Sequence, residues 1–313
     1  MTKKKGVPLL LIGFFIAAIA LSLVLIYGNN TKGNDKKQPV PKTGLNMVTP
    51  IPVPEVFKSP AKSGSVTILP WNSDDKFKAS MTAAGTPVLL AAYCTVLKDP
   101  LPGEEYNVHH AADLLKNYII KPWQVFSQND AIGPYSLDRG FKEGPTYIGS
   151  KLQKTIGGGV CKIASTLYNV AVLSNLQIVE RHLHSMPVPY VPYGQDATVS
   201  YGSMDFRFKN DSDSPVLIWA QGIDNTLYIA FYGKAKPDTV EWKHEISNVV
   251  PAPRLTRVNS SLPSGTEKVV SEGMDGATVR SWVLIKKQDG SVEKRYMSTS
   301  VYEPMAYIIE TNK

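Results

Sequence analysis

Cys161 is the residue of this sequence whose setting most favours chemistry. It follows a run of three glycines at 157–159 and stands at the start of a segment whose apolar residues recur with a helical period. Unpaired N–H groups at a helix start favour the thiolate, which is the nucleophilic form of cysteine. Open glycine backbone beside it would let a substrate carbonyl approach, with N–H groups near 159–162 available to an oxyanion. The pattern therefore predicts a candidate nucleophile.

Two histidines downstream of this cysteine could act as its general base. The segment 177–184 alternates like a strand, so His182 and His184 would share one face, about twenty residues after Cys161. A cysteine at a helix start followed by a strand-borne histidine is the chain order of papain-like amidases. The group that would orient the histidine stays open among three residues: Asp196, Asp205 and Asn169.

Other fates of Cys161 compete with catalysis. A free cysteine is often a small buried apolar residue. Cys94 is the second of only two cysteines, so the pair could form a disulfide in an oxidising compartment. His182 and His184 together with Cys161 or Asp196 could also hold zinc. We expect no metal and no cofactor, and the structural, disulfide and zinc interpretations remain alternatives to the nucleophile.

The elements that would position these residues indicate an α+β fold with a mainly antiparallel sheet and a few helices. One helix should run from about 160 to a left-handed stop at Asn175, and another from a cap at Asn107 to 120. Short apolar or alternating runs predict the strands. Those runs lie at 66–69, 88–93, 177–184, 197–201, 204–209, 216–221, 226–232, 279–286 and 293–301.

An apolar N-terminal segment predicts attachment to a membrane. Residues 6–27 carry no charge, and a helix of that length would reach about 33 Å, enough to cross a bilayer. The lysines at 3–5 favour a cytoplasmic N-terminus and an extracytoplasmic remainder. A cleaved signal peptide is the alternative, but the bulky residues that end the run suit a peptidase poorly. Residues 28–64, rich in Pro and Lys, predict an extended linker.

The positive charge belongs to this N-terminal part. The 313-residue chain has a formal charge of +7, and residues 65–313 net to zero. No basic face is therefore expected on the folded part, which argues against binding to nucleic acid.

Seven stretches resemble the VanW-like family, whose members are often encoded near glycopeptide-resistance or cell-wall genes. They include Trp-Gln-Val-Phe-Ser-Gln-Asn at 123–129, Gly-Gly-Gly-Val-Cys at 157–161 and Glu-Arg-His-Leu-His-Ser at 180–185. The others lie at 139–143, 165–169, 191–198 and 201–208. The resemblance covers about residues 90–235, within a domain expected at 65–235. In the C-terminal β region, 236–313, residues 264–313 resemble a G5-type wall-associated module more distantly.

The resemblance implies a peptidoglycan setting in a Gram-positive-type envelope. Two positions depart from the family's pattern, because Lys162 stands where Gln is usual and Gln195 where Arg is usual. Two functions follow as hypotheses: a membrane-anchored protein that binds peptidoglycan or its precursors, or a cysteine-dependent amidohydrolase or transpeptidase acting on peptidoglycan stem peptides. The predicted site residues are Cys161, His184, His182 and Asp196 for catalysis, and Gly157, Gly158, Gly159, Lys162, Arg181 and Asp205 for binding.

Overall fold

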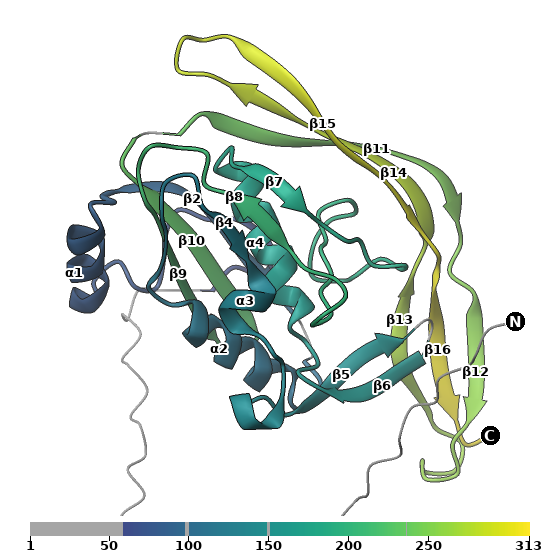
Figure 1. The fold of residues 1–313 in the computed structure, drawn as a ribbon. Coiled ribbons are helices and arrows are strands. Elements are labelled where there is room, and N and C mark those ends of the chain that lie inside the picture. The colour runs from purple at the N-terminus through teal and green to yellow at the C-terminus, as the bar shows by residue number, and fades with distance from the viewer. Residues whose placement is uncertain (1–58, 98–99, 149–150, 236) are drawn as a thin grey trace, which may run out of the picture. The chain divides into compact units, whose positions relative to one another are not determined.

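The computed structural model describes residues 59–97, 100–148, 151–235 and 237–313 (Figure 1). The predicted basic tail at 1–5, the predicted anchor at 6–27 and the linker up to residue 58 lie outside these residues. Among the residues that are described, no helix combines the length and the apolar character of a membrane span.

A five-stranded antiparallel sheet forms the centre of the first domain. Its order is β1-β2-β10-β9-β3, with bounds Gly64–Ser65, Val88–Val96, Thr226–Gly233, Val216–Ile223 and Tyr118–Ile120. Alternation along β2 sends Tyr93 into one buried cluster and its neighbours Ala92 and Cys94 into another. The sheet is therefore buried on both faces.

Helices α2 (Glu104–Leu115) and α4 (Cys161–Leu173) cover one face of this sheet, and α1 (Asp75–Ala84) covers the other through Phe77 (Figure 1). Helix α4 is buried almost all round, which explains its apolar sequence. Its stop is as predicted, because Asn175 has φ 57° just after the helix.

Three smaller pieces complete the first domain. A three-stranded sheet has the order β4-β8-β7, with bounds Val125–Ser127, Arg207–Lys209 and Gln177–Glu180. The hairpin β5–β6 spans Glu143–Ile148 and Lys151–Ile156. Short helices α3 (Gln128–Ile132) and η1 (Leu137–Arg139) connect β4 to this hairpin.

The C-terminal region forms two three-stranded sheets. One has the order β11-β14-β15, with bounds Thr239–Val250, Gly276–Lys286 and Val292–Tyr302. The other has the order β12-β16-β13, with bounds Arg254–Val258, Met305–Thr311 and Glu267–Met274. Val283 and Ile285 of β14 join the main core, and the Trp242 ring lies 5.7 Å from that of Tyr168 on α4. The first of these sheets thus shares a core with the preceding domain.

The α+β class with mainly antiparallel pairing is confirmed for the described residues, with β12 and β16 as a parallel pair. Several predicted boundaries were wrong. The predicted strand at 66–69 is not formed, because the chain turns so that Ile68 is 72% exposed while Leu69 is buried. Residues 62 and 63, predicted as linker, already bond to β2.

Other errors concern where elements end. Helix α2 begins at Glu104 rather than after Asn107, and it stops early because Asn117 adopts φ 66° and lets 118–120 pair with β9. The strand predicted at 177–184 ends at Glu180, and 197–201 makes only isolated bridges. The 279–286 and 293–301 hairpin is confirmed, extended at both ends.

Candidate active site

Cys161 is the first residue of α4, and a tightly packed glycine turn holds it there. Gly157 and Gly159 have φ of 78° and 102°, a region that other residues adopt at a cost. A Cβ on Gly158 would lie 2.2 Å from the backbone of Gly144, and the buried Asn107 side chain donates to the Gly158 carbonyl at 2.9 Å. Gly158 therefore packs against β5, whereas a Cβ on Gly157 would meet Tyr135 and one on Gly159 would meet Glu104. That this backbone admits a substrate stays a prediction.

The N–H groups at this turn are not equivalent. The N–H of Val160 donates to the Gly157 carbonyl at 3.2 Å, and that of Lys162 donates to the Gly159 carbonyl at 3.0 Å. Within the part of the chain that the structure describes, the N–H of Cys161 donates to no backbone carbonyl. This N–H, beside the thiol and at the positive end of α4, is the donor best suited to an oxyanion.

His184 lies between Cys161 and Asp196. Its Nδ1–H donates to Asp196 Oδ2 at 2.8 Å, and its backbone N–H donates to the same oxygen at 2.8 Å. Since Nδ1 is engaged, Nε2 is the ring nitrogen left to face Cys161, and the thiol and the imidazole are close enough to shift each other's pKa. The order Cys161–His184–Asp196 is that of a nucleophile, a base and the group that orients the base.

Asp196 is anchored through both of its carboxylate oxygens. Its side chain is only 3% exposed, and Arg181 Nη2 donates to Oδ1 at 2.9 Å. Arg181 Nε also donates to the backbone carbonyl of Asp196 at 2.7 Å. Tyr302 donates its hydroxyl to Oδ1 as well. A buried carboxylate with this many donors is fixed in both position and charge.

These contacts set the protonation of the site. Burial opposes a low pKa for the Cys161 thiol, but the hydrogen bond and charge of His184, with the Thr198 hydroxyl, lower its pKa below the usual value. Burial also works against the imidazolium, yet Asp196 and Cys161 raise the pKa of His184 to about 9. For Asp196 burial is outweighed by His184 and Arg181, which lower its pKa. The lowered pKa of the thiol and the raised pKa of the imidazole both favour a thiolate–imidazolium pair.

Family models match two parts of the chain: "VanW like protein" over residues 103–232 and "G5 domain" over residues 242–311. The chain therefore carries a VanW-like domain and, after it, a G5 domain. Both resemblances read from the sequence are confirmed, and the G5 domain begins earlier than the resemblance at 264–313 indicated. Cys161, His184 and Asp196 all lie in the VanW-like domain.

Two relatives match about half of the chain each. YoaR, an uncharacterised protein of Bacillus subtilis, is 36% identical over 143 residues, which are 46% of this chain and 47% of YoaR. The vancomycin B-type resistance protein VanW of Enterococcus faecalis is 26% identical over 173 residues, 51% of this chain and 63% of that protein. This chain thus matches about half of the first relative and under two thirds of the second.

Solved G5 structures also match the chain. The match to HP0197-G5 has a TM-score of 0.14 and 23% identity, and it covers 24% of this chain and 99% of that structure. The match to the G5 domain of IgA1 protease has a TM-score of 0.16 and 22% identity, and it covers 25% of this chain and 94% of that structure.

Several predicted residues of the VanW-like domain lie away from the Cys161–His184–Asp196 group. His182 donates from Nε2 to Glu180 at 2.9 Å. Asp205 accepts from Ser127 and from the Asn129 N–H. Asn169 donates to the carbonyls of Ser165 and Gln195. Of the three candidates for orienting the base, Asp196 is therefore the one that contacts His184.

The two departures from the family's pattern also point away from the thiol. Lys162 is buried and donates from Nζ to the Asn225 carbonyl at 3.0 Å, and burial lowers its pKa to about 8. Gln195 donates from Nε2 to His244 of the G5 domain at 2.9 Å. Neither side chain contacts Cys161, so the suggestion that Lys162 favours the thiolate has no support in the structure.

Sequence reasoning missed three residues near the site. The Thr198 hydroxyl lies 3.3 Å from Cys161 Sγ. Gln128 is fully buried: its Nε2 donates to the Val160 carbonyl, and its Oε1 has no hydrogen-bond partner among the described residues. Tyr302 comes from the G5 domain. Gln128 and Thr198 fall inside family-like stretches, which was the available signal, whereas nothing in the sequence connects Tyr302 to Asp196.

The alternatives for Cys161 can also be compared with the structure. Cys94 and Cys161 are both free thiols, so no disulfide joins them. Cys94 is buried with Ala92 on the face of the central sheet that α1 covers. Within the ranges that the structure describes, no group of three or more His, Cys, Asp or Glu side chains is arranged to hold a metal ion.

Proposed function

We propose that this protein is a cysteine-dependent amidohydrolase or transpeptidase that acts on peptide bonds of peptidoglycan. The observation that carries the proposal is the arrangement of Cys161, His184 and Asp196, in which His184 lies between the thiol and the carboxylate. In this arrangement the pKa of the thiol is lowered and the pKa of the imidazole is raised. A structural cysteine needs neither a base nor a buried carboxylate behind the base.

The chemistry follows from these positions. The Cys161 thiolate attacks the carbonyl carbon, and the resulting oxyanion is placed to accept from the Cys161 N–H. His184 then donates its Nε2 proton to the leaving amine as the C–N bond breaks, which leaves a thioester on Cys161. Water or an acceptor amine then attacks the thioester carbonyl and gives a proton to His184, and the C–S bond breaks to release the Cys161 thiolate. Water yields hydrolysis, and an amine yields a new peptide bond.

The peptidoglycan setting comes from the domains. The VanW-like and G5 domains are associated with the cell envelope, and the Enterococcus relative is named for vancomycin resistance. The apolar segment at 6–27 would place the protein on the cell membrane as a single-pass protein with its domains outside. Substrate would then lie within reach of the two folded domains.

The full chain is expected to release new amino groups from isolated sacculi, or to change their muropeptides, when products are separated by liquid chromatography and identified by mass. Turnover should fall above about pH 9, because His184 then loses the proton that the leaving amine needs. Thiol alkylation should not fall in that range, since it needs only the thiolate. Unchanged muropeptides and amines at every pH would contradict the proposal.

A second candidate function is non-catalytic binding to the wall, favoured by the G5 domain and by the departures at Lys162 and Gln195. The purified chain would then be retained on sacculi without altering their muropeptides. Failure to sediment with sacculi would contradict this candidate.

A further inference from the structure

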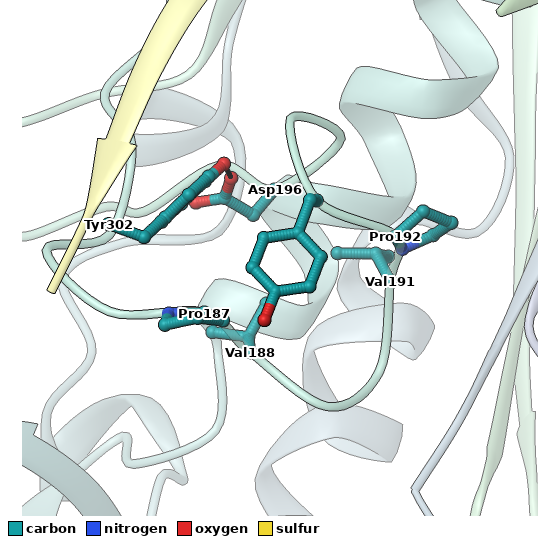
Figure 2. Close-up of a pocket in the computed structure, with 7 residues that line it drawn as sticks. Pro187, Val188, Val191, Pro192, Asp196 and Tyr302 are labelled. Atoms are coloured by element: carbon teal, nitrogen blue, oxygen red, sulfur yellow. Dashed lines mark hydrogen bonds between the residues drawn. The ribbon is translucent and has the colours of Figure 1, made fainter. Parts of the chain in front are cut away.

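Tyr302 connects the G5 domain to the candidate active site. It is the last residue of β15, its side chain is buried, and it lies 106 positions after Asp196 in the chain. Its hydroxyl donates to Asp196 Oδ1 and accepts from the Gly194 N–H at 2.9 Å. Figure 2 shows the Tyr302 hydroxyl beside the Asp196 carboxylate, with Pro187 and Val188 nearby.

The next residue of the chain, Glu303, adds a second contact, beside His184. The N–H of Glu303 donates to the carbonyl of Ser185 at 2.8 Å, and Ser185 directly follows His184. Consecutive residues of the G5 domain thus hold both ends of the segment that runs from His184 to Asp196. Tyr193, within that segment, also donates its hydroxyl to the Asp275 carbonyl.

The same strand supports Arg181. Arg181 Nη1 lies 3.4 Å from each of the hydroxyls of Ser298 and Ser300 on β15, while Nη2 donates to Asp196 Oδ1. Donors from Arg181 and Tyr302 therefore occupy Oδ1 and leave Oδ2 for His184. Fixing one oxygen of a carboxylate fixes the direction of the other.

We propose that Tyr302 is a positioning residue of the Cys161–His184–Asp196 site, so that the VanW-like domain has a complete site only when the G5 domain is docked against it. Its effect on turnover rests on the proposed function, whereas its effect on Asp196 does not. Burial and the charge of Asp196 raise the pKa of Tyr302, so its hydroxyl keeps the proton that it donates.

Tyr302→Phe removes the donor and keeps the ring that packs against Tyr193 at 5.6 Å. The direct measurement is the titration of the Asp196 carboxyl by carbon-13 NMR in the full chain, assigned through Asp196→Asn. Losing one donor leaves the carboxylate less stabilised, so the pKa of Asp196 should rise by about 1. Where turnover is measurable, kcat should fall roughly tenfold with little change in KM.

Two conservative variants serve as controls for the loss of a hydroxyl. The first is Tyr296→Phe, because Tyr296 lies on the same strand and its hydroxyl contacts Thr299 at the surface. Tyr193→Phe removes a tether to Asp275 and leaves both donors on Asp196 Oδ1 in place. Neither should move the Asp196 titration.

The outcomes separate this inference from the proposed function. An Asp196 titration that stays the same in Tyr302→Phe overturns the positioning role, whatever happens to turnover. A shifted titration in a protein that shows no turnover supports the positioning role and contradicts the enzymatic proposal.

Discussion

Replacing Cys161 with alanine should reduce processing of sacculi to the uncatalysed background, a loss on the order of 10⁴-fold or more. The Cys161 sulfur is the atom that would form the thioester, and no other described side chain beside His184 could act as the nucleophile in its place. The measurement compares muropeptide profiles and released amines for the wild type and Cys161→Ala at equal concentration.

Cys94→Ala is the matched control for this experiment. Cys94 is the other free cysteine, it is fully buried on the opposite face of the central sheet, and burial raises its pKa. Processing by Cys94→Ala should stay near the wild-type level. Equal processing by Cys161→Ala and the wild type would remove Cys161 from the reaction.

Asp196→Asn should have the second largest effect, because it acts on both activity and stability. Asn offers one oxygen where Asp196 offers two, so an amide NH₂ must face either Arg181 and Tyr302 or His184. With the base in the wrong tautomer or orientation, turnover should drop about 10³- to 10⁴-fold.

The stability loss has a separate cause. The Arg181 side chain is 8% exposed, and without Asp196 it becomes a buried charge with no ion-pair partner among the described residues, which costs about 3–5 kcal/mol of unfolding free energy. Denaturant unfolding of wild type and variant measures this difference. Asp289→Asn, at a fully exposed turn carboxylate, is the control and should change stability little.

The pH dependence of that difference has a definite sign. Asp196 has a lowered folded pKa, so its stabilising effect is present above its ordinary value of 3.8 and is lost as the pH falls through the folded value. The folded pKa of His184 is raised, so the stability that its imidazolium contributes is fully present below pH 6.5 and is lost as the pH rises through about 9. The gap between wild type and Asp196→Asn should therefore be largest between about pH 4 and 6.5. A gap that is constant from pH 4 to pH 9 would contradict this assignment.

The helix that presents Cys161 could be predicted from sequence because its evidence is local. Apolar period, a preceding glycine turn and a left-handed stop at Asn175 all lie within about twenty residues. The hairpin around Asp289-Gly290 was predictable for the same reason.

The strand carrying the histidines was predicted too long for a physical reason. Arg181 leaves the strand alternation because its guanidinium reaches both the carboxylate and the backbone carbonyl of Asp196. His184 then takes its position from Asp196 rather than from a sheet, while His182 bonds Glu180. A period-2 pattern contains no information about these side-chain contacts.

The choice among Asp196, Asp205 and Asn169 and the contribution of Tyr302 depend on tertiary structure. The segment from His184 to Asp196 is an irregular loop rich in proline, so sequence spacing gives no register for its carboxylate. Tyr302 reaches Asp196 from another domain. Such contacts are visible only once the two domains are folded together.

The rate of Cys161 alkylation as a function of pH, measured in a Cys94→Ala chain with and without His184→Ala, shows whether His184 activates the thiol. We expect the Cys161 thiol to ionise below its ordinary pKa of about 8.5, and its pKa to rise once His184 is removed, because burial is then opposed only by the contacts with Thr198 and Val199. An ordinary pKa that His184→Ala leaves unchanged, or a thiol that reacts only after unfolding, would contradict the assignment of Cys161 as a primed nucleophile.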